Sequence, residues 1–408
     1  MSKIKVLVIP SDTFGVGKFR ILDPFKYIGD NYSDEIHVDI AFNTEDNHDF
    51  FKNYDIVVFH SFIHKLPHEA NIARINWLKN QGIKVIMDID DHWKVDQRHP
   101  MYHQILFNKV SEKKVELMRL SDYVTTTTPV FANTIKTKLG IKNVLVFPNA
   151  VNDEEQQFQP NKIESEKIRF GWLGGSSHLH DLELLRNGIS SVYSAYGEKI
   201  QFVLCGFDTR GSVNEINKET NQVTQRPIQP METVWYKYEQ IFTDNYNVLD
   251  EEYKNYLMTF TEGNYVDKDK PYVRRWTREV SKYANNYNYF DVSLAPIVDS
   301  EFNTNKSQLK VIEAGFHKKA LIASEINPYT IDLISGVDDG KFNSKGNALL
   351  VSPNRNHKQW TQHMKKLYEN PNMIEDLGNR LYETVKDKYS LRKVCKDRVE
   401  FIKSIINK

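Results

Sequence analysis

The chain contains 408 residues, more than a single hydrophobic core usually supports, so we expect two domains. Hydrophobic residues make up 40% and charged residues 26% of the chain, a composition that excludes extended disorder. Lys plus Arg and Asp plus Glu both number 54, and this balance removes any global electrostatic reason for binding nucleic acid or an anionic membrane.

The cysteines and the apolar runs of the sequence indicate the cellular compartment in which the protein works. The two cysteines, Cys205 and Cys395, lie far apart in the sequence and lack metal-ligand spacing, which fits a reducing environment. The apolar run at the N-terminus is too short for a signal peptide, and no later run approaches the ~20 residues of a membrane span. We therefore expect a soluble cytoplasmic protein with no transmembrane segment.

The first part of the chain repeats a strand–helix pattern. Apolar runs rich in Val and Ile, each followed by helical periodicity, are KVLVIP (5–10), DIVVFHSF (55–62), KVIMDID (84–90) and NVLVFP (143–148). Because these runs do not alternate with polar residues, they predict parallel strands covered by helices on both faces. We assign residues 1–155 to a Rossmann-like, doubly wound α/β domain.

A polar stretch with Pro148 and Pro160 predicts a linker, after which the pattern restarts. Its strands are IRFGWLGG (168–175), IQFVLCGF (200–207), FDVSLAPI (290–297), KALIAS (319–324) and NALLVSP (347–353), which predict a second Rossmann-like domain over 166–375. Residues 208–265 exceed an ordinary connection and indicate an inserted helical element, or alternatively a segment that contacts an acceptor or partner. Residues 376–408 predict terminal helices, the last with an apolar face that must pack on the protein.

Ligands of open parallel sheets bind beyond the carboxyl ends of the strands, so the loops that directly follow strands are informative. The loop SDTFGVGKFRILDPF contains Gly15 and Gly17, whose small size lets backbone N–H groups approach a phosphate. Arg20 stands where a third glycine of the dinucleotide fingerprint would be. An anion-binding loop and an ordinary turn both fit this segment.

The loop that opens the second domain, FGWLGGSSHLHDLELL, has a similar form. Gly174 and Gly175 end the strand, and Ser176 is a candidate cap for the following helix. His178 is either a surface residue or a ligand contact. Paired glycines after the first strand of each domain favour two loops that line one ligand site.

The segment FDVSLAPIVDSEFNTNKSQLKVIEAGFHKKALIAS (290–324) is the strongest candidate for diphosphate binding. A helix predicted to begin near Lys306 or Ser307 offers free N–H groups, and Lys310 lies one turn further on. Glu313 is placed to accept hydrogen bonds from ribose hydroxyls. A solvated face with i,i+3 and i,i+4 charge pairs is the alternative interpretation.

The run VIMDIDDHW (85–93) ends an apolar strand in Asp88, Asp90, Asp91 and His92. An Asp-x-Asp pattern suits a hard divalent cation, but it equally suits catalytic carboxylates or the polar end of a strand. The residues alone leave these alternatives open.

The ordered set of segments resembles the GT-B glycosyltransferases, in particular their family 4-like branch, over nearly the whole chain. The segments that carry the resemblance are GVGKFRILDPF, KVIMDIDDHW, SDYVTTTTPVFANTIK, VLVFPNAVN, GWLGGSSHLHDL, FNTNKSQLKVIEAG, GNALLVSPNRNHKQW and LGNRLYETVKDKYSLRKVCKDRVEFI. The resemblance implies two Rossmann-like domains facing across a cleft. The C-terminal domain would hold a nucleotide-sugar donor, the N-terminal domain an acceptor, and the last helix would cross back to the N-terminal domain.

The resemblance also implies roles for individual residues. Glu313 looks like the second glutamate of a Glu-x7-Glu motif that binds the donor's ribose. Asn305 stands where the first glutamate should be, so Lys306 would supply charge there. Asp90, Asp91 and His92 would line the cleft beside the transferred sugar as catalytic candidates, without a metal ion.

The expected activity is transfer of a sugar from a UDP- or GDP-sugar to an acceptor hydroxyl, with retention and without a cofactor or metal. The acceptor could be a glycan, a lipid-linked sugar, a protein or a modified DNA base. A nucleotide-sugar 2-epimerase on the same fold is one rival. A non-catalytic nucleotide-binding or scaffold protein is another, since Asn305 departs from the motif.

Overall fold

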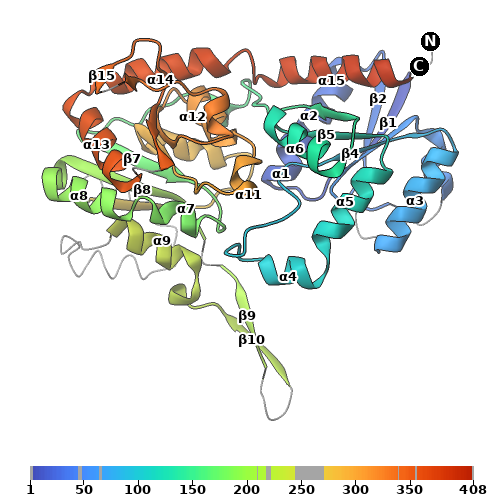
Figure 1. The fold of residues 1–408 in the computed structure, drawn as a ribbon, viewed down its shortest axis with the longest axis horizontal. Helices are drawn as coiled ribbons and strands as arrows, with labels where there is room; N and C mark the ends of the chain where they lie inside the picture. Colours follow the sequence, from blue (N-terminus) through green and yellow to red (C-terminus); the bar gives the residue numbers. More distant parts are fainter. Residues whose placement is uncertain are drawn as a thin grey trace.

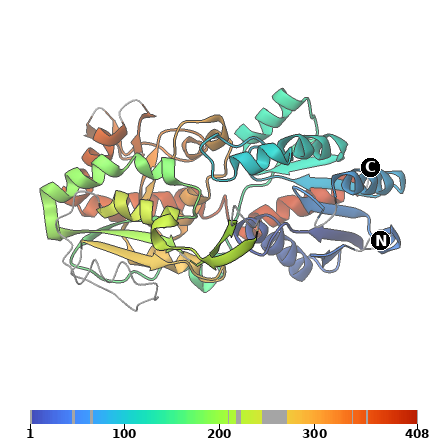
Figure 2. The same cartoon turned by 90° about the horizontal axis from the view of Figure 1, so that it is seen from below.

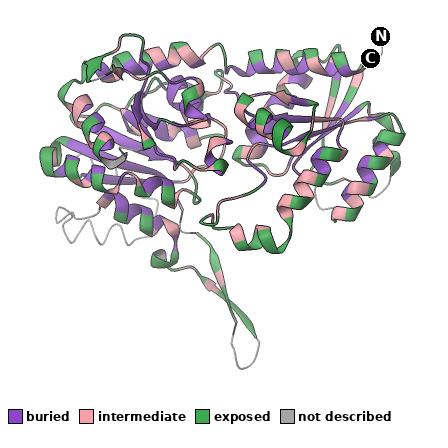
Figure 3. Ribbon diagram, viewed as in Figure 1, coloured by how far each residue is buried: buried purple, intermediate pink, exposed green. Residues whose placement is uncertain are grey.

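The computed structural model describes residues 3–44, 48–63, 67–208, 210–216, 222–243, 271–338, 340–353 and 356–406. Two lobes lie side by side, each built on a parallel sheet covered by helices (Figure 1). Both sheets are strongly buried, whereas the outer helices alternate between buried and exposed faces (Figure 3). These are the two Rossmann-like α/β domains that the strand–helix pattern predicts.

In the described part of the chain, the first sheet has six parallel strands in the order β2-β1-β3-β4-β5-β6. Successive side chains of a strand point to opposite faces, and here both faces are apolar: Val6 and Val8 enter one core, Leu7 and Ile9 the other. The strands are β1 Ile4–Ile9, β2 Ile36–Ile40, β3 Ile56–His60, β4 Lys84–Asp88, β5 Tyr123–Thr126 and β6 Val144–Val146. The helices are α1 Gly15–Gly17, the π-helical turn Lys18–Leu22, α2 Asp23–Asn31, α3 His68–Asn80, α4 Tyr102–Phe107, α5 Val110–Leu120 and α6 Pro129–Leu139, with a 3-10 turn at His48–Asn53.

The second sheet, counted over the described residues, also has six parallel strands, in the order β11-β8-β7-β12-β13-β16. They are β7 Ile168–Leu173, β8 Ile200–Phe207, β11 Tyr272–Trp276, β12 Val292–Ala295, β13 Ala320–Ser324 and β16 Leu349–Val351. The helices are α7 Leu179–Glu183, α8 Arg186–Tyr196, α9 Val234–Thr243, α11 Glu301–Thr304, α12 Leu309–Phe316, α13 Asn356–Glu369 and α14 Asn372–Val385. Short 3-10 turns are at Gln156–Phe158, Gly197–Lys199, Pro230–Glu232, Tyr283–Tyr289 and Tyr329–Ile331, and a small hairpin pairs β14 Val337–Asp338 with β15 Lys341–Phe342.

Helix α15 (Leu391–Ile406) connects the two lobes. It follows α14 of the second lobe but packs against α2 of the first, as both views show (Figures 1 and 2). Val394, Val399 and Ile402 enter the same core as Val6 and Val8. In the opposite direction, Phe19 of the first lobe packs in the core of the second. None of the helices in the described ranges combines the length and the apolar character needed to cross a bilayer.

The segment 208–265 is not helical at its start. Strands β9 (Ser212–Ile216) and β10 (Val223–Pro227) form an antiparallel hairpin that projects from the second lobe and is largely exposed (Figures 1 and 3). The helical prediction is therefore wrong for this part, since Val213, Ile216 and Val223 pair across a ladder that has no sequence-local signal. Helix α9 is helical as expected, and residues 209, 217–221 and 244–265 lie outside the described residues.

Candidate active site

Each sheet has a point where the strand order reverses. In the first sheet this point lies between β1 and β3, and in the second between β7 and β12. Loops on either side of such a point leave in opposite directions and open a crevice at the carboxyl ends of the strands. One pocket of about 590 Å³ lies there, lined from both lobes. Its lining includes ten residues that the sequence singled out: Gly15, Arg20, Asp90, Asp91, Gly175, His178, Lys306, Ser307, Lys310 and Glu313.

Two lysines stand at the start of α12. Lys306 lines the pocket, and across the described residues it forms no ion pair; its ammonium lies 4.8 Å from the centre of the Phe302 ring. Lys310 donates a hydrogen bond to the carbonyl of Leu173 and lies 5.2 Å from the Trp172 ring. Burial lowers the pKa of Lys310 to about 8. Both cations therefore lie where a diphosphate bound at the helix N-terminus would be.

Glu313 lies deeper in the pocket on the same helix. Tyr283 donates to Oε1, and Tyr287 donates to Oε2 at 3.0 Å, so both carboxylate oxygens are oriented by phenols. Burial raises the pKa of Glu313 from its ordinary value. Each oxygen keeps a lone pair for another donor such as a sugar hydroxyl.

The loop after β7 contributes backbone and His178. A Cβ at Gly174 would lie 2.4 Å from Cζ2 of Trp172, so only glycine fits there. Gly175 lines the pocket, whereas Ser176 does not. Nδ1 of His178 donates to Oδ2 of Asp181 at 2.8 Å, and burial, with Lys306 nearby, lowers the pKa of His178 to about 4. At neutral pH this imidazole is therefore uncharged.

The loop after β1 is held together by Asp12, and only part of the loop lines the pocket. Oδ1 of Asp12 accepts from the backbone N–H groups of Phe14 at 2.8 Å and Gly17 at 3.0 Å. A Cβ at Gly17 would lie 1.8 Å from the carbonyl oxygen of Asp12, which explains the glycine. Gly15 lines the pocket, but the N–H of Gly17 is already bound and does not line it.

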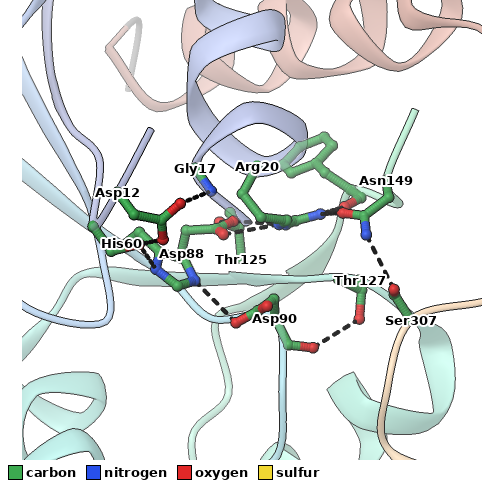
Figure 4. Close-up of polar contacts among 12 residues, drawn as sticks. Asp12, Gly17, Arg20, His60, Asp88, Asp90, Thr125, Thr127, Asn149 and Ser307 are labelled. Atoms are coloured by element: carbon green, nitrogen blue, oxygen red, sulfur yellow. Dashed lines mark hydrogen bonds and ion pairs between the residues drawn. The ribbon is translucent and has the colours of Figure 1, made fainter. Parts of the chain in front are cut away.

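Arg20 is buried in an ion pair (Figure 4). Its Nε and Nη2 donate to the two carboxylate oxygens of Asp88 at 2.9 and 2.6 Å, and Nη1 donates to Phe147 and Asn149. Burial alone would raise the pKa of Asp88, but Arg20 outweighs it and the pKa is lowered. The guanidinium lies at the pocket wall and is paired with Asp88, whereas neither Lys306 nor Lys310 forms an ion pair with a carboxylate of the described residues.

The carboxylates after β4 point to different partners. Asp88 binds Arg20 and Thr125, whereas Asp90 faces Nε2 of His60 at 3.0 Å (Figure 4). Burial raises the pKa of Asp90, but His60 outweighs it and the net pKa is lowered; burial and Asp90 raise the pKa of Asp91 to about 6. No three His, Cys, Asp or Glu side chains of the described residues are grouped so that they could hold a metal ion.

Two of the residues predicted from the sequence, His92 and Asn305, lie outside the central pocket. His92 stacks on Trp93 with ring centres 4.1 Å apart and lines a second pocket, where Nε2 lies 3.2 Å from Glu301. Asn305 is buried and donates to the carbonyl of Glu301 at 2.7 Å. Neither lines the central pocket, whereas Ser307 does and accepts from Asn149 at 3.0 Å, which joins the two lobes (Figure 4).

Several residues at the site were missed by the sequence analysis. His60 is the last residue of β3, so the rule that strands end at the ligand would have found it in DIVVFHSF. Asp12 follows β1 and had the same signal. Tyr283 and Tyr287 belong to a 3-10 turn that begins several residues after β11, and nothing in the local sequence indicates their contact with Glu313.

Comparison with known proteins identifies the fold. No protein-family model matches the chain, and no curated protein sequence matches it. Solved structures match over nearly the full length. Sucrose-phosphate synthase from Thermosynechococcus elongatus has a TM-score of 0.62 at 11% identity, covering 99% of this chain and 100% of that one. Anabaena Alr3699/HepE, in complex with UDP-glucose, has a TM-score of 0.60 at 11% identity, covering 98% and 100%.

The catalytic domain of starch synthase IV from Arabidopsis thaliana, bound to ADP and acarbose, has a TM-score of 0.59 at 10% identity and covers 100% of both chains. At these identities the likeness concerns the fold. The chain is a two-domain α/β protein with two facing Rossmann-like sheets. Its fold is GT-B, that of the glycosyltransferases it resembles; membership of family 4 stays a prediction.

Proposed function

We propose that the protein is a glycosyltransferase that moves a sugar from a nucleotide diphosphate sugar, a UDP- or GDP-sugar, to an acceptor hydroxyl. The observation that carries the proposal is a single pocket in which Lys306, Lys310 and Glu313 from one lobe face Asp91 from the other. The fold is shared with HepE, solved with UDP-glucose, and with starch synthase IV, solved with ADP.

The diphosphate would bind at the N-terminus of α12. Lys306 forms no ion pair among the described residues, and Lys310 is held by a neutral carbonyl that a phosphate oxygen would replace or supplement. Charge-assisted hydrogen bonds of this kind are about twice as strong as neutral ones. The helix dipole adds to the same field, so this arrangement supports leaving-group stabilisation by protein cations.

The ribose would bind to Glu313. Tyr283 and Tyr287 fix the carboxylate in one orientation, which lowers the entropy lost when it accepts a hydroxyl. The buried carboxylate makes the contact specific, because a donor analogue that lacks the hydroxyl would leave it unpaired.

In the proposed reaction the acceptor oxygen bonds to the anomeric carbon while the bond from that carbon to the phosphate oxygen breaks. We extend the proposal to retention of configuration and to independence from metal. The acceptor would approach on the face of the departing diphosphate, whose oxygen receives the hydroxyl proton, and Lys306 and Lys310 would stabilise the charge. Asp91 would orient the acceptor or stabilise positive charge at the anomeric carbon.

The acceptor would be a glycan, a lipid-linked sugar, a protein or a modified DNA base. A glycan is the first to test, because the starch synthase IV structure contains acarbose. A putative UDP-N-acetylglucosamine 2-epimerase from Listeria monocytogenes, with a TM-score of 0.52 at 9% identity, keeps epimerisation as the second candidate.

The test is turnover of UDP-, GDP-, ADP- and TDP-sugars with and without EDTA, with products separated by chromatography. We expect slow, EDTA-resistant release of nucleotide from one donor, lost in Glu313→Gln and kept in Glu375→Gln, an exposed control on α14. An isomerised donor without free nucleotide would establish the epimerase instead. Absence of binding to every nucleotide would contradict both and favour a scaffold protein.

A further inference from the structure

His178 lies in the loop after β7, lines the central pocket and is held by the protein at two points. Its backbone N–H donates to the hydroxyl of Tyr238 at 2.8 Å, and that hydroxyl donates to the carbonyl of Gly175 at 3.2 Å. Its imidazole donates from Nδ1 to Oδ2 of Asp181 at 2.8 Å. The backbone and the ring of His178 are therefore both fixed by neighbouring side chains.

Tyr238 comes from the segment inserted between β8 and β11. It lies on α9 (Val234–Thr243), which packs against α7 (Figure 1). Tyr238 is fully buried, and its ring meets that of Trp172 edge-on with centres 5.5 Å apart. Both hydrogen bonds of its hydroxyl have one possible direction, because a backbone N–H only donates and a carbonyl only accepts. The inserted segment thus supplies the group that closes the turn from Gly175 to His178.

Asp181 accepts hydrogen bonds at both of its carboxylate oxygens. Oδ1 accepts from the backbone N–H of Val298 at 2.8 Å and from Nδ2 of Asn303 at 3.0 Å, both in the segment that follows β12. Burial alone would raise the pKa of Asp181, but the hydrogen bond from His178 and the nearby Lys306 outweigh it, and the pKa is lowered. An ionised carboxylate has no hydrogen to give, so the hydrogen between Asp181 and His178 is on Nδ1.

The second ring nitrogen of His178, Nε2, is the atom that a ligand can reach. Burial, and then Lys306, lowers the pKa of His178 to about 4, so at neutral pH the ring carries one hydrogen, the one on Nδ1. Nε2 then has a lone pair, and it forms no hydrogen bond with the described residues. Such an acceptor binds a hydroxyl, whereas it repels a phosphate oxygen, which is itself an acceptor.

The position of His178 in the pocket indicates which hydroxyl it meets. Lys306, Lys310 and Glu313 follow one another in the direction of α12, with Lys306 just before the helix and Glu313 one turn beyond Lys310. Lys306 acts more strongly on His178 than Lys310 does, so His178 stands at the Lys306 end of this row, opposite to Glu313. With the ribose at Glu313 and the diphosphate at the lysines, the hydroxyls near His178 are those of the sugar.

We propose that His178 is a specificity-determining residue: held by Tyr238 of the inserted segment and by Asp181, it offers Nε2 to one hydroxyl of the sugar that is transferred. The proposal rests on the proposed transferase function, since it names a contact of the same donor. It also gives the inserted segment a role, because α9 supplies the hydroxyl that shapes the loop. One neutral hydrogen bond of this kind corresponds to roughly a three- to tenfold difference in affinity.

The first test needs no ligand. Protein labelled with ¹⁵N in its histidine rings is followed by NMR, and the His178 signals are assigned by their loss in His178→Asn. We expect a neutral ring at pH 7 with its hydrogen on Nδ1. An imidazolium, or a ring with its hydrogen on Nε2, would overturn the proposal, because neither has an acceptor at Nε2.

The second test compares ligands that differ by one hydroxyl. Calorimetry measures the affinity for the tightest-binding member of a panel of UDP- and GDP-sugars and for its analogues that each lack one hydroxyl of the sugar. We expect one analogue to bind the wild type roughly three- to tenfold more weakly. His178→Asn, which keeps a donor for Asp181 in place of Nδ1 but has nothing in place of Nε2, should bind donor and analogue equally.

His180→Asn, an exposed change two residues further on, is the matched control and should discriminate like the wild type. Affinity for UDP or GDP alone should be the same in all three proteins. If His178→Asn discriminates like the wild type, or if it weakens the binding of UDP or GDP itself, His178 does not bind a sugar hydroxyl and the proposal fails.

Tyr238→Phe tests the contribution of the inserted segment, because it removes the hydroxyl alone. The backbone N–H of His178 should exchange with solvent faster, and discrimination against the same analogue should shrink. Tyr272→Phe removes a buried hydroxyl that donates to Glu239 of the same helix, and it should change neither. A folded Tyr238→Phe protein with unchanged exchange and unchanged discrimination would contradict the proposal.

The outcomes separate this proposal from the transferase function. If no nucleotide sugar binds the wild type, the transferase function and the sugar contact fail together. If a nucleotide sugar binds but no single hydroxyl depends on His178, the sugar contact alone is overturned.

Discussion

Arg20 and Asp88 form a buried, two-pronged ion pair that ties the π-helical turn after β1 to the last residue of β4. Both side chains are almost fully excluded from solvent, with 1% and 0% exposure. The sequence alone leaves open whether the loop that contains Arg20 binds an anion, and the geometry makes Arg20 a structural partner of Asp88 at the pocket wall.

Arg20→Met should destabilise the fold by about 3 to 5 kcal/mol, because it leaves the Asp88 carboxylate buried and unpaired. The measurement is urea unfolding followed by circular dichroism. Lys393→Met, which removes an exposed i,i+4 ion pair with Asp397, should cost less than about 1 kcal/mol. A folded Arg20→Met protein of ordinary stability that had lost donor binding would mean that Arg20 binds the donor.

Gly17→Ala should also destabilise the protein, by about 2 kcal/mol or more, because the new Cβ would meet the carbonyl of Asp12 at 1.8 Å. Gly15→Ala is the matched variant, since a Cβ there meets nothing within 4 Å, and the change should be neutral or slightly stabilising. Thermal and urea unfolding of both variants compare them directly. Equal stabilities would contradict the close approach at Gly17.

Donor binding should weaken as the pH rises from 7 to 9. Burial lowers the pKa of Lys310 from 10.5 to about 8, so the ammonium loses its proton in this range and with it a charged hydrogen bond to the diphosphate. Lys310→Met should bind nucleotide roughly tenfold or more weakly at pH 7 and lack this pH dependence. Calorimetric titration with the nucleotide diphosphate measures both effects.

The Lys386→Met variant, which removes a half-buried ammonium paired with Glu383, serves as the control for general electrostatics and should keep the wild-type pH dependence. A pH-independent affinity in the wild type would show that Lys310 does not contact the bound diphosphate.

Asp91→Asn should lower kcat by roughly a hundredfold or more while leaving donor affinity unchanged. Burial and Asp90 raise the pKa of Asp91 from 3.8 to about 6, so in the wild type an acid limb near pH 6 should appear in the kcat profile and disappear in the variant. Activity and nucleotide binding, each measured between pH 4.5 and 8, test this. If the acid limb remained in Asp91→Asn, the group that titrates there would not be Asp91.

The raised pKa of Asp91 also predicts how the stability of the fold changes with pH. Since the folded-state pKa of Asp91 lies above its unfolded value of 3.8, stability is lost as the pH rises from about 4 to about 6. Asp91→Asn removes this loss and should unfold at higher urea at pH 7, by on the order of 1 kcal/mol, with no gain at pH 4. Asp376→Asn, an exposed change on α14, should show neither effect.

The sequence by itself determined the parallel sheets and the position of the ligand-facing loops. Runs such as KVLVIP lack polar alternation because both faces of β1 are buried, and this pattern is local. Lys306, Lys310 and Glu313 were also found locally, because they follow one strand in the sequence; Lys310 and Glu313 lie on α12, and Lys306 lies just before it. These features depend on nearest neighbours along the chain.

Tertiary structure alone decided which candidates remain available to a ligand. Arg20 is bound by Asp88, the N–H of Gly17 by Asp12, and Asp90 by His60, although the residues of two of these pairs are 68 and 30 positions apart. The hairpin of β9 and β10 likewise depends on pairing between two strands. A polar group binds whichever partner the fold brings closest, and the strand order that places β1 beside β3 cannot be read from local periodicity.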